Sequence, residues 1–323
     1  MSWDRIRAAR EKFERFLLQR ANVVGVGVGK KVIAGKETET PAVMVFVEKK
    51  LPEAQLKKTD IVPKTLDDVK TDVVETGRLK AQRATVGEEK PRTARWRPAP
   101  GGVSIGHVQI TAGTLGGLVR DGGRRMILSN NHVLAASNDG RRGDAILQPG
   151  PADSGTREDI IANLERFVTI RFERSTTGGS GFAAALGRLM DRLRSRPQRN
   201  FVDAAIARPT RDDLVSDEII DMKRTPGIME AEVGLRVLKS GRTTGVTAGK
   251  ILATNATVQI DYGRNVATFA DQLLSGPMSE GGDSGSLLLD LEGRTVGLLF
   301  AGSDRTTVFN RARRVAEALR VEF

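Results

Sequence analysis

The stretch Ser279-Glu280-Gly281-Gly282-Asp283-Ser284-Gly285, followed by the apolar run Leu287-Leu288-Leu289, is the most informative part of this 323-residue chain. Serine is a weak nucleophile near neutral pH unless a base takes its proton and backbone donors stabilise the oxyanion. Glycines beside a serine permit the tight turn that such donors require. The alternative is an ordinary Asp-Ser-Gly turn without catalytic meaning. Two upstream segments favour the catalytic interpretation.

The first upstream segment, residues 126–134, is a short apolar strand that leads into a polar turn carrying His132, one of only two histidines. Imidazole is the usual general base near pH 7. The second segment, residues 200–207, places Asp203 within an otherwise apolar strand. An unpaired carboxylate among apolar neighbours is costly, so Asp203 is expected to have a partner. The order along the chain is therefore His132, Asp203, Ser284.

This order and these motifs resemble those of the trypsin/chymotrypsin-like serine proteases, in a bacterial form without disulfides. The resemblance covers roughly residues 100–320. The interval between His132 and Asp203 is longer than in the family, which we attribute to an insertion at about 174–199. The resemblance implies a mainly β fold, a chymotrypsin-like double β-barrel of Greek-key type.

The resemblance also implies a role for each matching residue. Ser284 attacks a peptide carbonyl, His132 accepts and returns the proton, and Asp203 orients the imidazole. The N–H groups of Gly282 and Ser284 form the oxyanion hole. The implied activity is that of a serine endopeptidase (a hydrolase acting through an acyl-enzyme), with a protein or peptide substrate and with no metal or organic cofactor.

Other residues compete for these roles. His132 alone is also compatible with a turn histidine bonded to backbone. Asp144, Asp153 and Asp159 are alternatives to Asp203, but they lie among turn formers and are expected to be solvated. His107 alternates with apolar residues and is expected to be structural.

The substrate pocket is placed by the same resemblance. Its base is expected about six residues before the nucleophile, at Met278, and its walls near Phe300, Ala301 and Gly302. No acid stands at position 278, so a preference for Lys or Arg is not supported. The pocket is weakly expected to favour a substrate residue with an apolar or small side chain.

Two features depart from the secreted members of the family. The chain has no cysteine, so a reducing compartment is compatible with it. No activation site resembling an Ile-Val N-terminus is present, so Asp283 needs a different partner or the site is held ready without cleavage.

The N-terminal residues lack the apolar core of a signal peptide, and no apolar run is long enough to span a bilayer. We therefore expect a cytoplasmic protein without a membrane span.

Residues 1–85 are expected to form a small α+β domain, for which a regulatory role is one interpretation. The first 20 residues have the spacing of an amphipathic helix, with Ser2 as a candidate N-cap, and packing on a sheet is favoured over membrane docking. Residues 23–29 alternate like a strand, and Lys30 excludes a dinucleotide-binding loop. Residues 42–47 and 71–75 are further strands. Residues 86–100 are the expected linker, and residues 101–323 the protease domain.

The insertion at about 174–199 has helical spacing over residues 182–196, with arginines on one face. It is compatible with a lid, with a helix that binds a regulatory protein, or with a helix packed on the barrel. A regulatory partner is equally compatible with the N-terminal domain.

The net charge of +11 raises a second hypothesis, a catalytically silent protease-like module that binds nucleic acid or a protein partner. Aromatic residues make up only 4% of the chain and the basic residues are dispersed, so nucleic acid is the less favoured partner.

Overall fold

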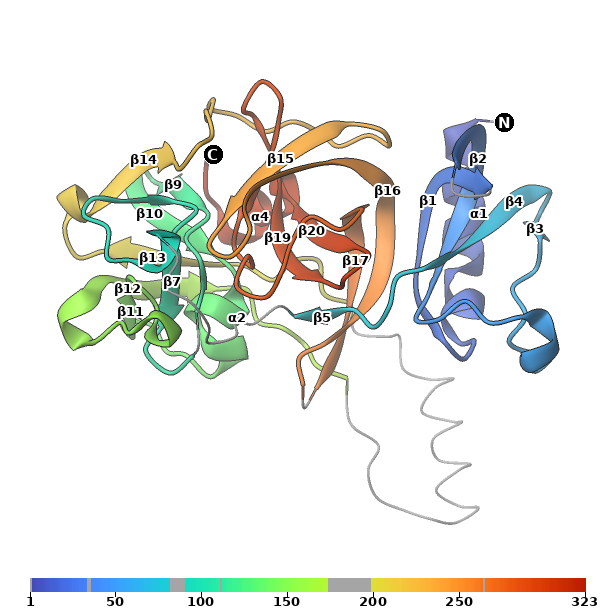
Figure 1. Ribbon diagram of the computed structural model, residues 1–323, viewed down its shortest axis with the longest axis horizontal. Helices are drawn as coiled ribbons and strands as arrows, with labels where there is room; N and C mark the ends of the chain where they lie inside the picture. The colour runs from blue at the N-terminus through green and yellow to red at the C-terminus, as the bar shows by residue number, and fades with distance from the viewer. Residues whose placement is uncertain (1, 34–35, 82–90, 111, 174–198, 264) are drawn as a thin grey trace, which may run out of the picture.

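The computed structural model describes residues 2–33, 36–81, 91–110, 112–173, 199–263 and 265–323. The expected helical insertion therefore lies almost entirely outside the described residues. The chain is mainly β, with an α+β region at its N-terminus, as the sequence predicts (Figure 1).

The N-terminal region consists of one helix packed on a small sheet. Helix α1 (Trp3–Leu18) begins after Ser2, whose hydroxyl accepts a hydrogen bond from the N–H of Arg5, as predicted for an N-cap. Strands β1 (Val23–Ile33), β2 (Lys36–Val47), β3 (Thr65–Leu66) and β4 (Val69–Glu75) follow. Ile6 and Leu17 of α1 are fully buried against valines of β1 and β2. The apolar face of the helix thus packs on a sheet, as favoured over membrane docking.

The first sheet of the remaining chain has seven strands in the order β8-β7-β11-β12-β13-β10-β9. They are β7 (Ser104–His107), β8 (Gly113–Thr114), β9 (Gly117–Asp121), β10 (Arg124–Ser129), β11 (Ala145–Leu147), β12 (Ile160–Phe167) and β13 (Ala205–Pro209). Strands β10 and β13 are antiparallel neighbours, with Ile127 opposite Ala207. This pairing brings the segments that follow β10 and precede β13 to the same end of the sheet. Strands β6 (Ala99–Gly101) and β14 (Val215–Ile219) pair separately.

The other large sheet contains a closed ring of six strands, which is called the second barrel because it follows the first sheet along the chain. Its order is β15-β18-β19-β20-β17-β16, and β15 also pairs with β16. The strands are β15 (Arg236–Gly241), β16 (Gly245–Asp261), β17 (Val266–Ser275), β18 (Leu287–Asp290), β19 (Thr295–Gly302) and β20 (Thr307–Arg311), followed by helix α4 (Ala312–Leu319). A cluster of buried side chains from both sheets and α4, including Leu287, Leu298, Met126 and Val315, joins this barrel to the first sheet.

The N-terminal region is continuous with the second barrel through strand β16, which lies between them in Figure 1. Strand β1 pairs antiparallel with β16, with Gly25 opposite Val258 and Gly29 opposite Ala253. A Cβ at Gly29 would lie 2.6 Å from the carbonyl oxygen of Leu252. The glycines predicted to lie in a strand therefore let two backbones approach closely.

Residues 91–100, the described part of the expected linker, pack against the barrels. Arg92 donates to the hydroxyl of Ser240 at 2.7 Å, and Trp96 packs against the core of the first sheet. A short strand, β5 (Lys80–Ala81), precedes them and pairs with both β16 and β19. The chain between the N-terminal region and the first sheet thus contacts the second barrel.

Candidate active site

His132 lies on a single helical turn, α2 (Asn131–Leu134), directly after β10. Two neighbouring amides fix the turn: the side chain of Asn130 donates to the carbonyl oxygen of Asp203 at 2.7 Å, and that of Asn131 donates to the carbonyl oxygen of Val168 at 2.8 Å. Only 2% of the His132 side chain is exposed. The imidazole is therefore held in a defined position at the end of the sheet, buried from solvent.

Asp203 is fully buried two residues before β13 and contacts His132 twice. Its Oδ2 lies 2.6 Å from Nδ1 of His132, and its Oδ1 accepts from the backbone N–H of His132 at 3.3 Å. A carboxylate only accepts, so Nδ1 carries the proton. The partner expected for Asp203 is thus His132, and the alternative of a merely backbone-bonded His132 does not describe this geometry.

The second ring nitrogen of His132, Nε2, is buried and has no hydrogen-bond partner among the described residues. With Nδ1 protonated, a neutral imidazole presents Nε2 as a lone pair. A buried acceptor without a donor is uncommon and calls for an explanation. Nε2 can therefore accept a proton from a hydroxyl that comes within hydrogen-bond distance.

Ser284 lies on the turn that precedes β18. Gly282 and Gly285 have positive φ values of 99° and 100°, and a Cβ at Gly285 would lie 2.2 Å from the carbonyl oxygen of Thr114. Thr114 fixes the turn by donating its hydroxyl to the carbonyl oxygen of Gly282 and its N–H to that of Ser284, both at 2.8 Å. The conformation of the turn thus requires glycine at 282 and 285, and the close approach to Thr114 also requires it at 285.

The hydroxyl of Ser284 is fully buried and donates to the carbonyl oxygen of Phe300 at 3.3 Å. It does not bond to Nε2 of His132 in this arrangement. Rotation about its Cα–Cβ bond redirects Oγ without moving the backbone. In enzymes without bound substrate, hydrogen bonds between catalytic groups are often long or absent.

The sequence did not identify a partner for Asp283. In the structure this partner is Lys239 of β15. Both side chains are fully buried, with Nζ 3.0 Å from Oδ2. Burial lowers the pKa of the Lys239 ammonium, and the Asp283 carboxylate opposes this effect. Asp283 also accepts from the N–H groups of Thr243, Thr244 and Glu280 and from the hydroxyl of Thr244. These bonds hold the turn of Ser284 in place with no new N-terminus involved.

The residues predicted to form the substrate pocket fall into two places. The side chain of Met278 packs among core residues of the second barrel that include Val237, Leu273 and Leu299. Phe300 and Ala301 belong to a different cluster, which faces the N-terminal region. The backbone of Ala301 and Gly302 pairs with β5. Their role as a pocket stays a prediction.

The alternatives to Asp203 all have other partners. Asp144 accepts from Nε2 of His107 at 3.0 Å; Asp153 is bound by Arg242, and Asp159 by Arg95. Asp153 and Asp159 are nearly buried rather than solvated, since arginines cover them. The fully buried His107 is structural, as predicted.

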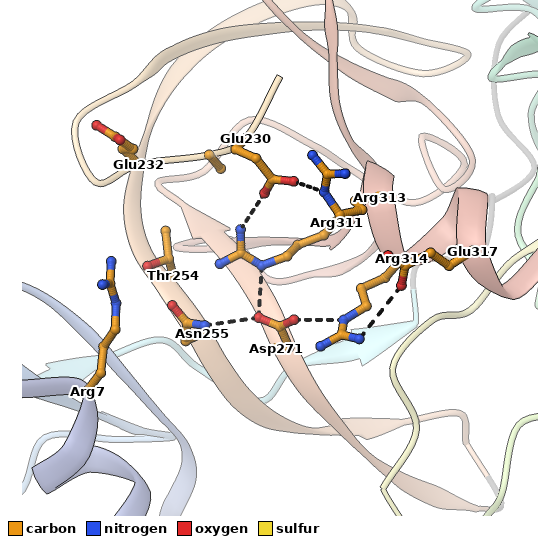
Figure 2. A pocket seen from close by; sticks show the side chains of 11 residues that line it. Arg7, Glu230, Glu232, Thr254, Asn255, Asp271, Arg311, Arg313, Arg314 and Glu317 are labelled. Atoms are coloured by element: carbon orange, nitrogen blue, oxygen red, sulfur yellow. Dashed lines mark hydrogen bonds and ion pairs between the residues drawn. The ribbon is translucent and has the colours of Figure 1, made fainter. Parts of the chain in front are cut away.

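A cavity of about 620 Å³ lies between α1, α4 and the strands β16, β17 and β20, and neither His132, Asp203 nor Ser284 lines it. Figure 2 shows three of its arginines facing carboxylates: Arg311 and Arg314 both bind Asp271, and Arg313 binds Glu230. Carboxylates balance the arginines that line this cavity, so it does not offer a basic surface for phosphate.

Comparisons with known proteins match different parts of the chain. Residues 4–74 match the family model of the NARROW LEAF 1 N-terminal domain. No curated protein gives a significant sequence match. The similar solved structures are bacterial proteases. Chymotrypsin of Cellulomonas bogoriensis has a TM-score of 0.45 at 20% identity, covering 69% of this chain and 97% of that chain. Protease A of Thermobifida fusca has a TM-score of 0.46 at 20% identity, covering 69% of this chain and 96% of that chain. Nocardiopsis protease has a TM-score of 0.43 at 18% identity, covering 69% of this chain and 97% of that chain.

Two residues of the site were missed by sequence reasoning. Lys239 interrupts the apolar run Val237-Leu238, and a charge within a strand is a usable signal for a buried partner. Tyr262, the only tyrosine of the chain, donates its hydroxyl to Oδ2 of Asp203 at 2.8 Å. Its position in the sequence carries no motif, and only the fold brings it to Asp203.

Two further observations concern the described residues only. None of the helices in this part of the chain is long and apolar enough to cross a bilayer. Over the same residues, no group of three or more histidine, aspartate or glutamate side chains is placed to hold a metal ion.

Proposed function

We propose that the chain is a serine endopeptidase in which His132, Asp203 and Ser284 act as a catalytic triad. The observation that carries the proposal is the buried pair of His132 and Asp203, whose Nδ1–Oδ2 distance is 2.6 Å and whose Nε2 is left without a donor among the described residues. A histidine in this state is prepared to accept a proton from a serine. The Gly-flanked turn of Ser284 and its buried Asp283–Lys239 support fit the same role.

In the proposed reaction, Ser284 Oγ rotates to Nε2, gives up its proton and bonds to the peptide carbonyl carbon. The oxyanion is stabilised by the N–H groups of Gly282 and Ser284. Protonated His132 returns the proton to the leaving amine as the C–N bond breaks, leaving an acyl-enzyme. Water then adds to the ester, with His132 again accepting a proton, and releases the acid and Ser284.

Hydrolysis of an unfolded protein such as casein tests this proposal without knowledge of the natural substrate. The wild-type protein is expected to release peptides, and Ser284→Ala and His132→Ala are each expected to lose at least about 10³-fold in rate. His107→Ala is the matched control, because that histidine is bonded to Asp144 and lies outside the triad. Equal hydrolysis by wild type and Ser284→Ala would contradict the proposal.

The N-terminal region is proposed to regulate access to this site. Strand β5 pairs antiparallel with the end of β19, with Ala81 opposite Ala301 and Lys80 opposite Gly302. Extended peptides commonly bind by adding a strand to such an edge. The chain itself thus lies where the predicted pocket would receive a substrate, and Ser284 is fully buried. Strand β5 is only two residues long, so it is expected to lower the basal rate rather than abolish it. A protein partner that binds the N-terminal region and displaces β5 would raise the rate. The cytoplasmic location stays a prediction.

A further inference from the structure

The carboxylate of Asp203 is bound from two sides. Nδ1 of His132 lies 2.6 Å from its Oδ2, and the hydroxyl of Tyr262 donates to the same oxygen at 2.8 Å. The rings of His132 and Tyr262 also meet edge to face, with centroids 6.0 Å apart. We infer that Tyr262 is a positioning residue of the active site, whose hydroxyl fixes the carboxylate of Asp203 and, through it, the imidazole of His132. The inference deepens the proposed function and rests on it.

Tyr262 is itself held firmly. It follows the end of β16, is 5% exposed, and donates its backbone N–H to the carbonyl oxygen of Asn265 at 2.8 Å. Its ring packs edge to face on Phe172 at 5.4 Å and contacts Phe269 at 6.3 Å. A side chain fixed by packing orients a hydrogen bond at little entropic cost.

The hydroxyl is what distinguishes this residue from the aromatic side chains around it. Packing against Phe172 and Phe269 needs only an aromatic ring, which phenylalanine supplies. The chain has 11 phenylalanines and this single tyrosine, and its hydroxyl lies at the buried carboxylate. A fully buried carboxylate needs donors to offset its lost hydration. Tyr262 is thus placed to stabilise the charge of Asp203 and to limit the directions in which it can turn.

The strand that carries Tyr262 is also the strand that joins the N-terminal region to the barrel. Strand β1 pairs with β16 between Ala253 and Val258, and the N–H of Asp261 donates to the carbonyl oxygen of Leu79 at 3.1 Å. The strand that leads into Tyr262 is thus hydrogen-bonded directly to the N-terminal region.

The test compares wild type with Tyr262→Phe, which removes only the hydroxyl. The first readout is the rate of covalent labelling by a fluorophosphonate, which needs no natural substrate. Loss of a hydrogen bond to a charged group is expected to slow labelling about 10-fold to 100-fold. Thr210→Val is the matched control, since it removes a hydroxyl that is bonded to the carbonyl oxygen of Ile161 rather than to Asp203; its labelling rate is expected to stay within about twofold of wild type.

The second readout is the low-field proton NMR signal of His132 Nδ1–H. If Tyr262 only packed its ring, removal of its hydroxyl would leave this chemical shift unchanged. Without the competing Tyr262 donor, Oδ2 accepts more strongly from Nδ1–H, so the signal is expected to move downfield in Tyr262→Phe. The ring proton that His107 shares with Asp144 is an internal reference and is expected to stay in place.

Because Tyr262 is the only tyrosine, growth on 3-fluorotyrosine alters this position alone and provides a second variant should Tyr262→Phe not fold. The fluorinated phenol is the stronger acid and the stronger donor, so the His132 signal is expected to move upfield, opposite to the Phe variant.

The outcomes separate this inference from the proposed function. Slowed labelling of Tyr262→Phe with opposite NMR shifts in the two variants supports the inference. Labelling of Tyr262→Phe within twofold of wild type, or an unmoved His132 signal, overturns it while leaving the triad intact. Absence of labelling in wild type overturns the proposed function instead, and the NMR shifts then decide alone whether Tyr262 fixes Asp203.

Discussion

Replacement of Lys239 by methionine tests the buried support of the nucleophile turn. Methionine fills a similar volume without the ammonium, so Asp283 would be left as a buried carboxylate 0% exposed. Breaking a buried ion pair by removal of one partner typically costs about 3–5 kcal/mol. Three backbone N–H groups and the Thr244 hydroxyl still donate to Asp283, so we expect the lower end, about 3 kcal/mol.

The free energy of unfolding, measured by denaturant titration, checks this magnitude, and the fluorophosphonate labelling rate reports the geometry of Ser284. Both are expected to fall in Lys239→Met. The double variant Lys239→Met/Asp283→Asn removes the uncompensated charge, so it is expected to recover about 1–2 kcal/mol. Lys223→Met, at an exposed lysine, is the control and is expected to change stability by less than about 0.5 kcal/mol. A Lys239→Met protein as stable and as reactive as wild type would refute the reasoning.

Three other perturbations test separate parts of the structure. Ala81→Pro removes a backbone N–H from β5 and is expected to speed fluorophosphonate labelling of Ser284. Ala81→Ser, which keeps that N–H, is the control. Equal labelling rates for the two variants would argue against the proposal that β5 lies in the substrate site. Glu14→Ala leaves Arg10, whose pKa burial already lowers, without its partner 2.6 Å away, and is expected to cost about 2–4 kcal/mol in unfolding experiments; a loss below about 0.5 kcal/mol would contradict a buried pair. Hydrogen bonds from a backbone N–H and an imidazole hold the pKa of Asp144 below its usual range, so its stabilisation is present above about pH 4 and is lost as the pH falls through the folded-state pKa. Asp144→Asn should therefore be less stable than wild type at pH 7, with the difference shrinking in acid; a constant difference would disprove this linkage.

The local elements of the fold were largely predictable, because their signals lie within short windows. The 3–4 spacing of apolar residues in the first 20 positions and the Ser2 cap predict α1, and alternation in 23–29 predicts β1. The pairing of β1 with β16 was not predictable, since it joins a segment near the N-terminus to one in the last third of the chain. No periodicity within either strand reports which other strand it pairs with.

The same distinction applies to the site. His132 and Asp203 each carry a local signal, a histidine after an apolar strand and a carboxylate within one, and the structure places them in contact. Lys239 and Tyr262 are recognisable only through their partners, Asp283 and Asp203, which lie far from them along the chain. Pairing over such separations is set by barrel topology.

The most direct measurement of the central claim is peptide mapping by mass spectrometry after reaction with a fluorophosphonate. Loss of fluoride and formation of one phosphonate ester on Ser284 in the wild-type protein, absent from His132→Ala, is the predicted result. An adduct on Ser279 or Ser286 instead, or none at conditions that label other serine hydrolases, would contradict an activated Ser284.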